Sequence, residues 1–372
     1  MYDRTDPEGL GDCLSEADDE SPIAGLPHLH RAPPLPGVRP LVSICIPVFN
    51  RERYIDDAIE SALGQTYEPL EIVVVDDAST DGTVERVRSY NQPRIRLFVN
   101  GHNLGQNANR NRAVALARGE LIKFLDSDDM LDPDCVARMV RLFAEDPAVG
   151  LVFARKRVAF EVGFDEVPPD LQQTWLGLTR DAHEGFSELR ELNDGRTLLA
   201  DMLTGDGPIV NWIGQPSAVM VRRDHLAVSG VFAYNVRMRV ELDLWVRLFA
   251  HARVGFIDEE LVTYRWGHGA ENISLARLGS DWIEQLWILE ALACDREVRQ
   301  AYPQIDAKLC KERRQAYRTA LRFGFPAAEG VKRVPVQPYL RYARFRVLSR
   351  VGRPPALFAV LPQGRRFGVP ES

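Results

Sequence analysis

The sequence predicts an α/β protein with a mostly parallel sheet that is covered by helices on both faces. Short apolar segments rich in β-branched residues alternate with segments of helical periodicity from about residue 42 to residue 125. Two of the apolar segments end in clusters of aspartates. Because ligands of such folds bind outside the carboxyl ends of the strands, we expect these acids to belong to one binding site.

The first strand is expected at residues 42–46, where an apolar run stops at Pro47 and Asn50. Apolar residues then recur at helical spacing and predict an amphipathic helix. They are Ile55, Ala58, Ile59 and Ala62. A second strand is expected at residues 70–75, in which Glu71 is a polar interruption.

The same alternation predicts four further elements. They are a helix at residues 83–90, a strand at 95–99, a helix at 106–118 and a strand at 120–125. The last strand leads into Asp126, Asp128 and Asp129. In an extended segment residues i and i+2 point the same way, so Asp126 and Asp128 are predicted to face one ligand while Asp129 turns away. Mg²⁺ and Mn²⁺ prefer carboxylates and share their shells with phosphates, although the same acids also suit a turn and a helix cap.

These segments resemble the glycosyltransferase family 2 enzymes, which have the GT-A fold. The resemblance rests on five segments in the family's order and spacing, at residues 43–50, 61–67, 71–83, 103–105 and 124–129. It implies a Rossmann-like sheet and an inverting transfer of sugar from a nucleoside diphosphate sugar, most commonly a uridine diphosphate sugar, to a hydroxyl acceptor. Mn²⁺ or Mg²⁺ would be the cofactor. The products implied are glycans, cell-surface polysaccharides or glycolipids.

The resemblance also implies roles for single residues. Pro47 and Phe49 resemble the loop that packs on the nucleotide base, and Asp77 resembles the acid that binds the base. Asp126 and Asp128 resemble the D-x-D motif that meets ribose, diphosphate and metal. The remaining members of the expected donor and metal site are Asn50, Asp76, Asn103, Gly105 and Asp129. Phe49 also suits a core position, and Asp76 or Asp77 a helix N-cap.

The catalytic base is expected in a helix that begins near Val240. The family usually reads Glu-Asp-x-Asp-Leu-Trp here with the first Asp as base, and Glu241 occupies that position. A glutamate has the same chemistry on a longer arm, so Glu241 is expected to accept the proton of the acceptor hydroxyl. Asp243 is the alternative base, although its spacing from Arg247 also predicts a surface ion pair. His268, in a loop behind the expected last strand, is a further candidate for binding diphosphate or metal.

Four regions are expected along the chain. They are an acidic and Pro-rich disordered leader at 1–40, a nucleotide-sugar-binding half at 41–153, an acceptor-binding and catalytic half at 154–275 with an insertion at 155–210, and a basic helical region at 276–372. Between Lys308 and Arg366, fifteen Lys or Arg stand against two Glu. Such a segment suits an anionic membrane surface, or packs on the enzyme or on a second subunit of an oligomer.

Composition adds further expectations. The 372 residues, 45% of them hydrophobic, can bury a sizeable core. The five cysteines have no paired spacing, which indicates reduced thiols. No apolar run reaches the roughly 20 residues of a membrane span and no signal-peptide pattern is present, so a cytoplasmic enzyme is expected, with peripheral contact to the inner membrane face as one option. Nucleic acid is not expected as a partner, because the net charge is -7 and no binding motif occurs.

Rival functions differ in what they need after the first strand. A nucleotidyltransferase would place a Gly-rich phosphate loop there, and residues 47–51 contain no glycine. A nicotinamide-dependent enzyme would need G-x-G-x-x-G, which is absent. A non-catalytic sugar-nucleotide-binding protein stays compatible with the sequence because of the glutamate at position 241.

Overall fold

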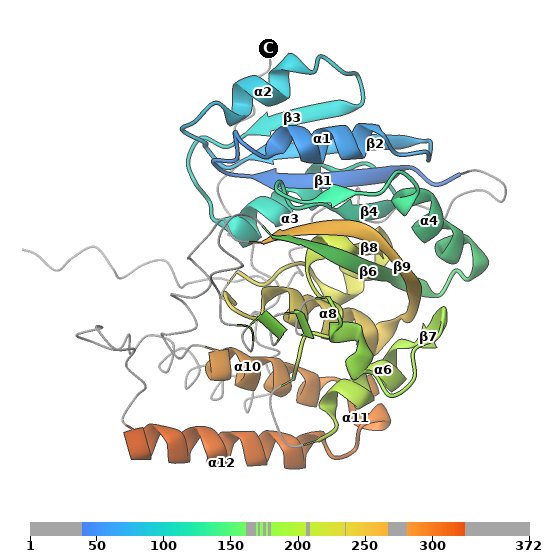
Figure 1. Cartoon of the computed structure of the whole chain (residues 1–372). Helices are drawn as coiled ribbons and strands as arrows, with labels where there is room; N and C mark the ends of the chain where they lie inside the picture. The colour runs from blue at the N-terminus through green and yellow to red at the C-terminus, as the bar shows by residue number, and fades with distance from the viewer. Residues whose placement is uncertain are drawn as a thin grey trace, which may run out of the picture.

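The computed structural model describes residues 39–160, 180–205, 209–234, 236–266 and 281–323, with a few isolated residues between 161 and 179. Nine strands in this part of the chain form one sheet in the order β3-β2-β1-β4-β8-β6-β9-β5, and β7 pairs with β9 (Figure 1). The fold is the predicted α/β arrangement of a central sheet flanked by helices.

The first half of the chain follows the predicted alternation, with element ends within two residues of the expected ones. Its elements are β1 (Val42–Val48), α1 (Ile55–Leu63), β2 (Leu70–Asp76), α2 (Thr83–Ser89), β3 (Ile95–Val99), α3 (Gln106–Leu116) and β4 (Leu121–Phe124). The four strands pair in parallel, with β1 between β2 and β4, and β3 beyond β2. Their carboxyl ends therefore lie at one edge of the sheet.

The second half makes the sheet mixed. Its elements up to the last strand are β5 (Met130–Leu131), α4 (Cys135–Glu145), β6 (Val149–Phe160), η2 (Ala182–Gly185), β7 (Leu192–Asp194), α6 (Gly195–Leu203), η3 (Pro216–Ala218), β8 (Val219–Arg222), α7 (Arg223–Ser229), α8 (Val240–His251) and β9 (Arg253–Trp266). Strand β8 runs antiparallel to both β4 and β6, whereas β6 and β9 are parallel to each other. The parallel character predicted from the first half thus does not extend through the whole sheet.

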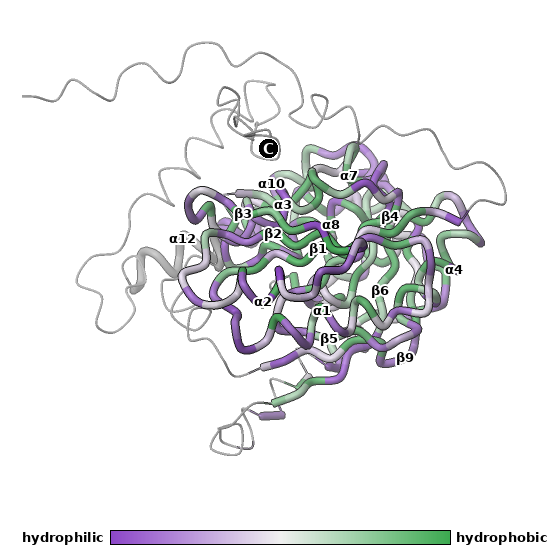
Figure 2. Tube along the Cα trace, turned by 90° about the horizontal axis from the view of Figure 1, so that it is seen from above, coloured by the Kyte–Doolittle hydropathy of each residue, from purple (hydrophilic) through white to green (hydrophobic). Residues whose placement is uncertain are grey.

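The sheet has an apolar core on each face. Ile44 and Ile46 of β1 face the core that α1 and α4 cover, while Cys45 between them faces the core of α3, α6 and α8. This alternation is the period of two that a strand imposes. Figure 2 shows the strands as apolar segments through the interior, with more hydrophilic segments around them.

Three helices follow the sheet in the chain: α10 (Asp281–Cys294), α11 (Arg296–Ala301) and α12 (Ile305–Phe323). They lie beyond α8, on the side away from β1 and β2 (Figure 1). Buried residues of α10, such as Leu289, and the first turns of α12, with Ile305 and Leu309, extend the core of α8. The helical C-terminal region that the sequence predicts is therefore present, and its first part is packed into the core.

None of the helices described in the structure combines the length and the apolar character needed to cross a lipid bilayer. Four of the cysteines lie in the described ranges, where Cys45 and Cys135 are buried and Cys294 and Cys310 are exposed, and these four are free thiols. The expected leader lies almost entirely outside the described residues, as does the basic segment after Phe323.

Candidate functional site

The loops after β1, β2 and β4 meet at the carboxyl edge of the sheet. The loop after β1 is tied to the loop after β2 through Asn50, whose N–H donates to Ser79 Oγ at 2.8 Å and whose Oδ1 accepts from the N–H of Thr80 at 2.8 Å. Asn50 adopts a positive φ of 51°. Pro47 is the last residue but one of β1, which ends at Val48. Phe49 is 40% exposed, so the core position considered for Phe49 is wrong.

Asp77 organises the loop that leads into α3. Its Oδ1 accepts from Asn100 Nδ2 at 2.7 Å and from the N–H of Leu104 at 2.8 Å, and its Oδ2 accepts from the N–H of Gly105 at 2.9 Å. Gly105 has a φ of 87°, a conformation that favours glycine, and its N–H also contacts Asn103 Oδ1 at 3.0 Å. Asp77, Asn103 and Gly105 therefore form one hydrogen-bonded unit.

Asp76 lies beside this unit and is fully buried. Its Oδ1 accepts from the N–H of Ser79 at 2.9 Å, and its Oδ2 is buried without a hydrogen-bond partner. Neither Asp76 nor Asp77 is the N-cap of α2, which is Gly82. Most buried polar atoms in folded proteins have a hydrogen-bond partner, so this oxygen makes Asp76 a candidate for contact with a ligand.

The three acids after β4 do not lie as an extended segment. The N–H of Asp129 donates to the carbonyl of Asp126 at 3.0 Å, so the chain turns here and lacks the extended geometry expected for Asp126 and Asp128. Asp128 pairs with Arg51 at 3.1 Å, while Asp126 contacts a different arginine. Asp129 is buried, its Oδ1 accepts from the N–H of Arg265 at 3.0 Å, and its Oδ2 has no partner.

Arg110 is the residue that sequence reasoning missed. Its side chain is only 3% exposed, yet it pairs with carboxylates from two distant parts of the chain. Nη2 donates to Asp126 Oδ1 and Oδ2 at 3.0 and 3.1 Å, and Nη1 donates to Glu241 Oε1 at 3.0 Å. The guanidinium also lies 5.4 Å from the ring centre of Phe232. Arg110 joins the D-x-D segment to the expected catalytic base.

The sequence did contain a signal for Arg110. Ala113, Val114 and Ala117 are buried in the core at positions i+3, i+4 and i+7 from it. An arginine on the apolar face of a helix has to find carboxylate partners, because an unpaired buried charge is costly. A search for partners along the predicted sheet edge would have pointed to the acids after β4.

The structure separates the two candidate bases. Glu241 is the second residue of α8, and its side chain is 23% exposed beside Arg110. Asp243 is only 2% exposed and pairs with Arg247 at 2.6 Å, so the ion pair predicted for the surface is buried. Arg247 is held further by the carbonyl oxygens of Ser229 and Val231. Glu241, and not Asp243, therefore joins the cluster at the sheet edge.

Burial and neighbouring charges shift the pKa values of several groups at this edge of the sheet. Burial raises the pKa of Asp126 above its usual range, with Arg110 opposing the rise and Asp128 adding to it. Burial and the neighbouring Asp128 and Asp126 raise the pKa of Asp129 strongly. Although burial alone would lower the pKa of Arg110, Asp126 and Glu241 raise it above its ordinary value, so the guanidinium stays charged. Burial lowers the pKa of the nearby Lys156 to about 8.

The carboxylate oxygens after β4 are ligands that suit a hard divalent cation. Asp126, Asp128 and Asp129 supply oxygen ligands, and the buried Oδ2 of Asp129 is unsatisfied. In the described ranges no group of three or more His, Cys, Asp or Glu side chains is arranged to hold an ion on its own. Such ions need only one or two carboxylates when substrate phosphates complete the shell, so the set suits an ion that binds together with a diphosphate. His268 lies outside the described residues.

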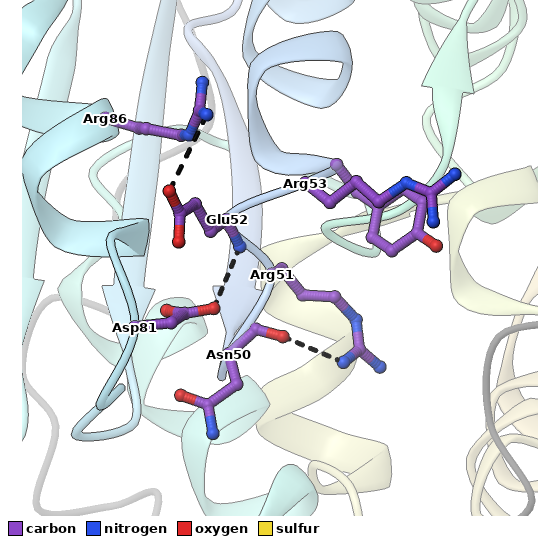
Figure 3. Close-up of a pocket in the computed structure, with 7 residues that line it drawn as sticks. Asn50, Arg51, Glu52, Arg53, Asp81 and Arg86 are labelled. Carbon is purple, nitrogen blue, oxygen red and sulfur yellow. Dashed lines mark hydrogen bonds and ion pairs between the residues drawn. The ribbon is translucent and has the colours of Figure 1, made fainter.

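A pocket of 410 Å³ opens beside the loop after β1 (Figure 3). It is lined by Asn50, Arg51, Glu52, Arg53, Tyr54, Asp81 and Arg86. The N–H of Glu52 donates to Asp81 Oδ2 at 3.1 Å, and the Glu52 carboxylate faces Arg86 at 3.7 Å. None of the three aspartates after β4 lines this pocket, which adjoins them through the contact between Arg51 and Asp128.

Comparison with known proteins gives one family. Residues 43–196 match the family described as Glycosyl transferase family 2. An uncharacterised protein of Mycobacterium tuberculosis is 34% identical over 69% of this chain and 77% of its own length. A chondroitin synthase of Escherichia coli is 42% identical over 32% of this chain, and the match spans 17% of that longer protein.

A solved structure is similar over a larger part of the chain. TarS of S. aureus, in complex with UDP-GlcNAc, superimposes with a TM-score of 0.55 at 20% sequence identity, covering 84% of this chain and 92% of that one. At this level of identity the likeness concerns the fold, which agrees with the GT-A arrangement of sheet and helices.

Proposed function

Because the chain belongs to glycosyltransferase family 2, we propose that it transfers a sugar from a uridine diphosphate sugar to a hydroxyl acceptor, with inversion at the anomeric carbon. The UDP-GlcNAc bound by the structurally similar TarS supports the choice of nucleotide. The chondroitin synthase among the relatives supports an acceptor in glycan, cell-surface polysaccharide or glycolipid synthesis. One observation carries the proposal. Arg110 joins Asp126, which belongs to the proposed donor-binding side of the site after β4, to Glu241 in one cluster.

Each part of the site at the carboxyl edge of the sheet has a role in the proposed reaction. The loop of Phe49 and Asn50, with Asp76 and the unit around Asp77, binds the nucleotide. Asp126 and Asp128, with Asp129 as the alternative, would hold Mn²⁺ or Mg²⁺. When bound, the ion supplies positive charge that stabilises the departing nucleoside diphosphate.

Glu241 acts on the acceptor in this proposal. Arg110 holds Oε1 of Glu241. Oε2 of Glu241 accepts the proton of the acceptor hydroxyl while the hydroxyl oxygen attacks the anomeric carbon. Asp243 is the alternative base, and its pairing with Arg247 argues against that role.

Donor binding is tested by thermal denaturation with a panel of UDP, GDP and thymidine diphosphate sugars, each with and without Mn²⁺. A ligand at 100 times its Kd stabilises the native state by about 2.7 kcal/mol, so a matching donor raises the Tm measurably. We expect a UDP-sugar to raise the Tm, and Mn²⁺ to increase the effect. If no donor raises the Tm and none is hydrolysed, the proposal is wrong.

The base is tested by replacing Glu241. We expect Glu241→Gln to lower kcat by roughly 10²- to 10⁴-fold, the usual contribution of general base catalysis, while the donor still raises the Tm. Glu241→Asp restores the residue usual in the family and should retain more activity than Glu241→Gln. Full activity in Glu241→Gln would place the base elsewhere.

A non-catalytic sugar-nucleotide-binding protein is the second candidate function. The glutamate in place of the usual aspartate, and its ion pair with a buried arginine, favour this alternative. It predicts a donor-dependent rise in Tm without transfer or hydrolysis for every donor that binds.

A further inference from the structure

The segment before α8 determines where Glu241 lies, and α3 holds its first part. Asn111 accepts the N–H of Phe232 at 3.0 Å and donates to the carbonyl of the same residue at 2.8 Å. Asn107 Nδ2 donates to the carbonyls of Ala233 and Val236 at 2.7 and 2.8 Å. One side of this segment is thus attached to the same helix that carries Arg110.

Glu284 of α10 holds the second part of the segment. Its Oε1 accepts from the N–H of Arg237 at 2.9 Å, and its Oε2 accepts from the N–H groups of Met238 and Arg239 at 2.8 and 2.9 Å. Glu284 is 3% exposed. A carboxylate buried this deeply is stable because it receives three charge-assisted hydrogen bonds.

These contacts place a negative charge at the beginning of α8. Arg239 is the N-cap of that helix, and no side chain of its own caps it by a hydrogen bond. The first N–H groups of a helix lack partners within the helix and carry partial positive charge, so an anion there is stabilising. Glu284, which belongs to another helix, supplies that anion. It accepts from the N–H of Arg239, which lies two residues before Glu241.

Helix α10 is held by hydrogen bonds of Gln285 to two other parts of the chain. Gln285 Oε1 accepts from the N–H of Ile209 at 3.0 Å, and Gln285 Nε2 donates to Glu312 Oε2 of α12 at 3.1 Å. Arg239 Nη1 donates to the carbonyl of Ile209 at 2.6 Å. The C-terminal helices and the segment before α8 therefore form one connected network of buried and partly buried polar contacts.

We propose that Glu284 is a positioning residue for Glu241, an inference that rests on the proposed role of Glu241 as base. Residues 43–196, which match the family, contain the donor side of the site but neither α8 nor α10. The C-terminal helices are then part of the catalytic unit of this protein. Arg110 contacts the side chain of Glu241, and Glu284 holds the backbone just before α8.

The test compares Glu284→Gln with the wild type and with Glu297→Gln, in the full chain. Glutamine keeps the size of the side chain but presents an NH₂ group to N–H donors. Glu297 lies on the neighbouring α11 and makes an exposed ion pair with Arg196, so Glu297→Gln controls for loss of a charge in the same region. The measurements are kcat and KM for the donor, the donor-induced shift in Tm, and amide hydrogen exchange.

We expect Glu284→Gln to lower kcat on the order of 10- to 100-fold, because a small displacement of a catalytic group has effects of this size. The donor KM and the Tm shift should stay within about twofold, since the donor side is untouched. Amide exchange should accelerate at residues 237–243 and stay unchanged in α3. Glu297→Gln should match the wild type in all four measurements.

Three results would overturn the inference. One is unchanged exchange at residues 237–243, which would mean that Glu284 does not hold the segment. Another is faster exchange with unchanged kcat, and the third is a parallel loss of kcat and donor binding, which would indicate a general structural role. A wild type without transfer to any acceptor would instead count against the proposed function, and the exchange data would still show whether Glu284 holds the segment.

Discussion

At the scale of single residues, one guanidinium connects the two sides of the site. Arg110 contacts Asp126 with one nitrogen and Glu241 with the other, and it is almost fully buried between them. A planar fork can satisfy two carboxylates at once, which the ammonium of a lysine cannot do with the same geometry. The relative placement of the donor-side acid and the proposed base therefore depends on this side chain.

We predict that Arg110→Lys lowers kcat by about 100-fold, because Asp126 and Glu241 lose their common partner. Steady-state kinetics with the donor identified in the Tm screen measures the effect. Arg88→Lys serves as the control, since Arg88 is an exposed arginine of α2. Wild-type kcat in Arg110→Lys would show that the bridge has no part in the reaction.

Asp243 is predicted to matter for stability. Removing one member of a buried ion pair leaves the other charge unpaired and costs about 3–5 kcal/mol, so Asp243→Asn should lower the free energy of unfolding by that amount. Urea denaturation measures it. The exposed i, i+4 pair of Arg141 and Glu145 is the matched control, and Glu145→Gln should change stability by less than about 1 kcal/mol. Unchanged stability together with lost turnover would instead make Asp243 the base.

At the scale of elements, strand β2, next to the edge strand β3, carries a buried carboxylate. Glu71 Oε1 accepts from Ser43 Oγ and from the N–H of Arg118, both at 2.6 Å, and Oε2 accepts from Arg96 at 2.9 Å. Burial by itself raises the pKa of Glu71, but these hydrogen bonds outweigh it and lower the pKa below the ordinary value of 4.5. Glu71 of β2 thus connects this strand to β1, to β3 and to the segment just after α3.

This contact predicts a pH dependence of stability. A carboxyl whose pKa is lowered in the folded state stabilises the fold above its unfolded value of 4.5, and the contribution is lost as the pH falls through the folded value. At pH 7, Glu71→Gln should be less stable than the wild type by about 1–3 kcal/mol. The difference should shrink below pH 4.5 in urea denaturation, and a difference that is constant with pH would contradict the assignment.

At the scale of the whole molecule, the C-terminal part combines packing with charge. Ile305 and Leu309 of α12 are buried in the core, so the start of this helix belongs to the enzyme. After Phe323 the sequence contains nine Lys or Arg and two Glu. We propose that this last segment contacts an anionic membrane surface, where each basic residue contributes about 1 kcal/mol of attraction.

We predict that the full chain sediments with vesicles containing phosphatidylserine and that the chain without residues 324–372 does not. Binding should weaken as salt rises, because screening shortens the range of the attraction. The truncation leaves the buried contacts of α12 in place and should keep the Tm of the full chain. Equal binding of both forms, or binding to neutral vesicles, would contradict the proposal.

The sequence by itself determined the alternation of strands and helices and the edge at which the polar loops meet. These follow from local properties, since a period of two or 3.6 and a terminating proline or glycine are visible in a short window. The family motifs around Asp77 and Asp126 are local in the same sense. For this reason the elements of the first half were predicted to within two residues.

Only the tertiary structure decided which charges meet. It turned Asp129 inward, paired Asp243 with Arg247 in the core, and brought Arg110 to Glu241 and Glu284 to the start of α8. Partners so far apart in the chain are chosen by the topology of the sheet and the packing of helices on it, which short-range patterns do not contain. A buried charge is stable only beside its partner, so these pairings, and with them the proposed catalytic arrangement, arise when the whole chain folds.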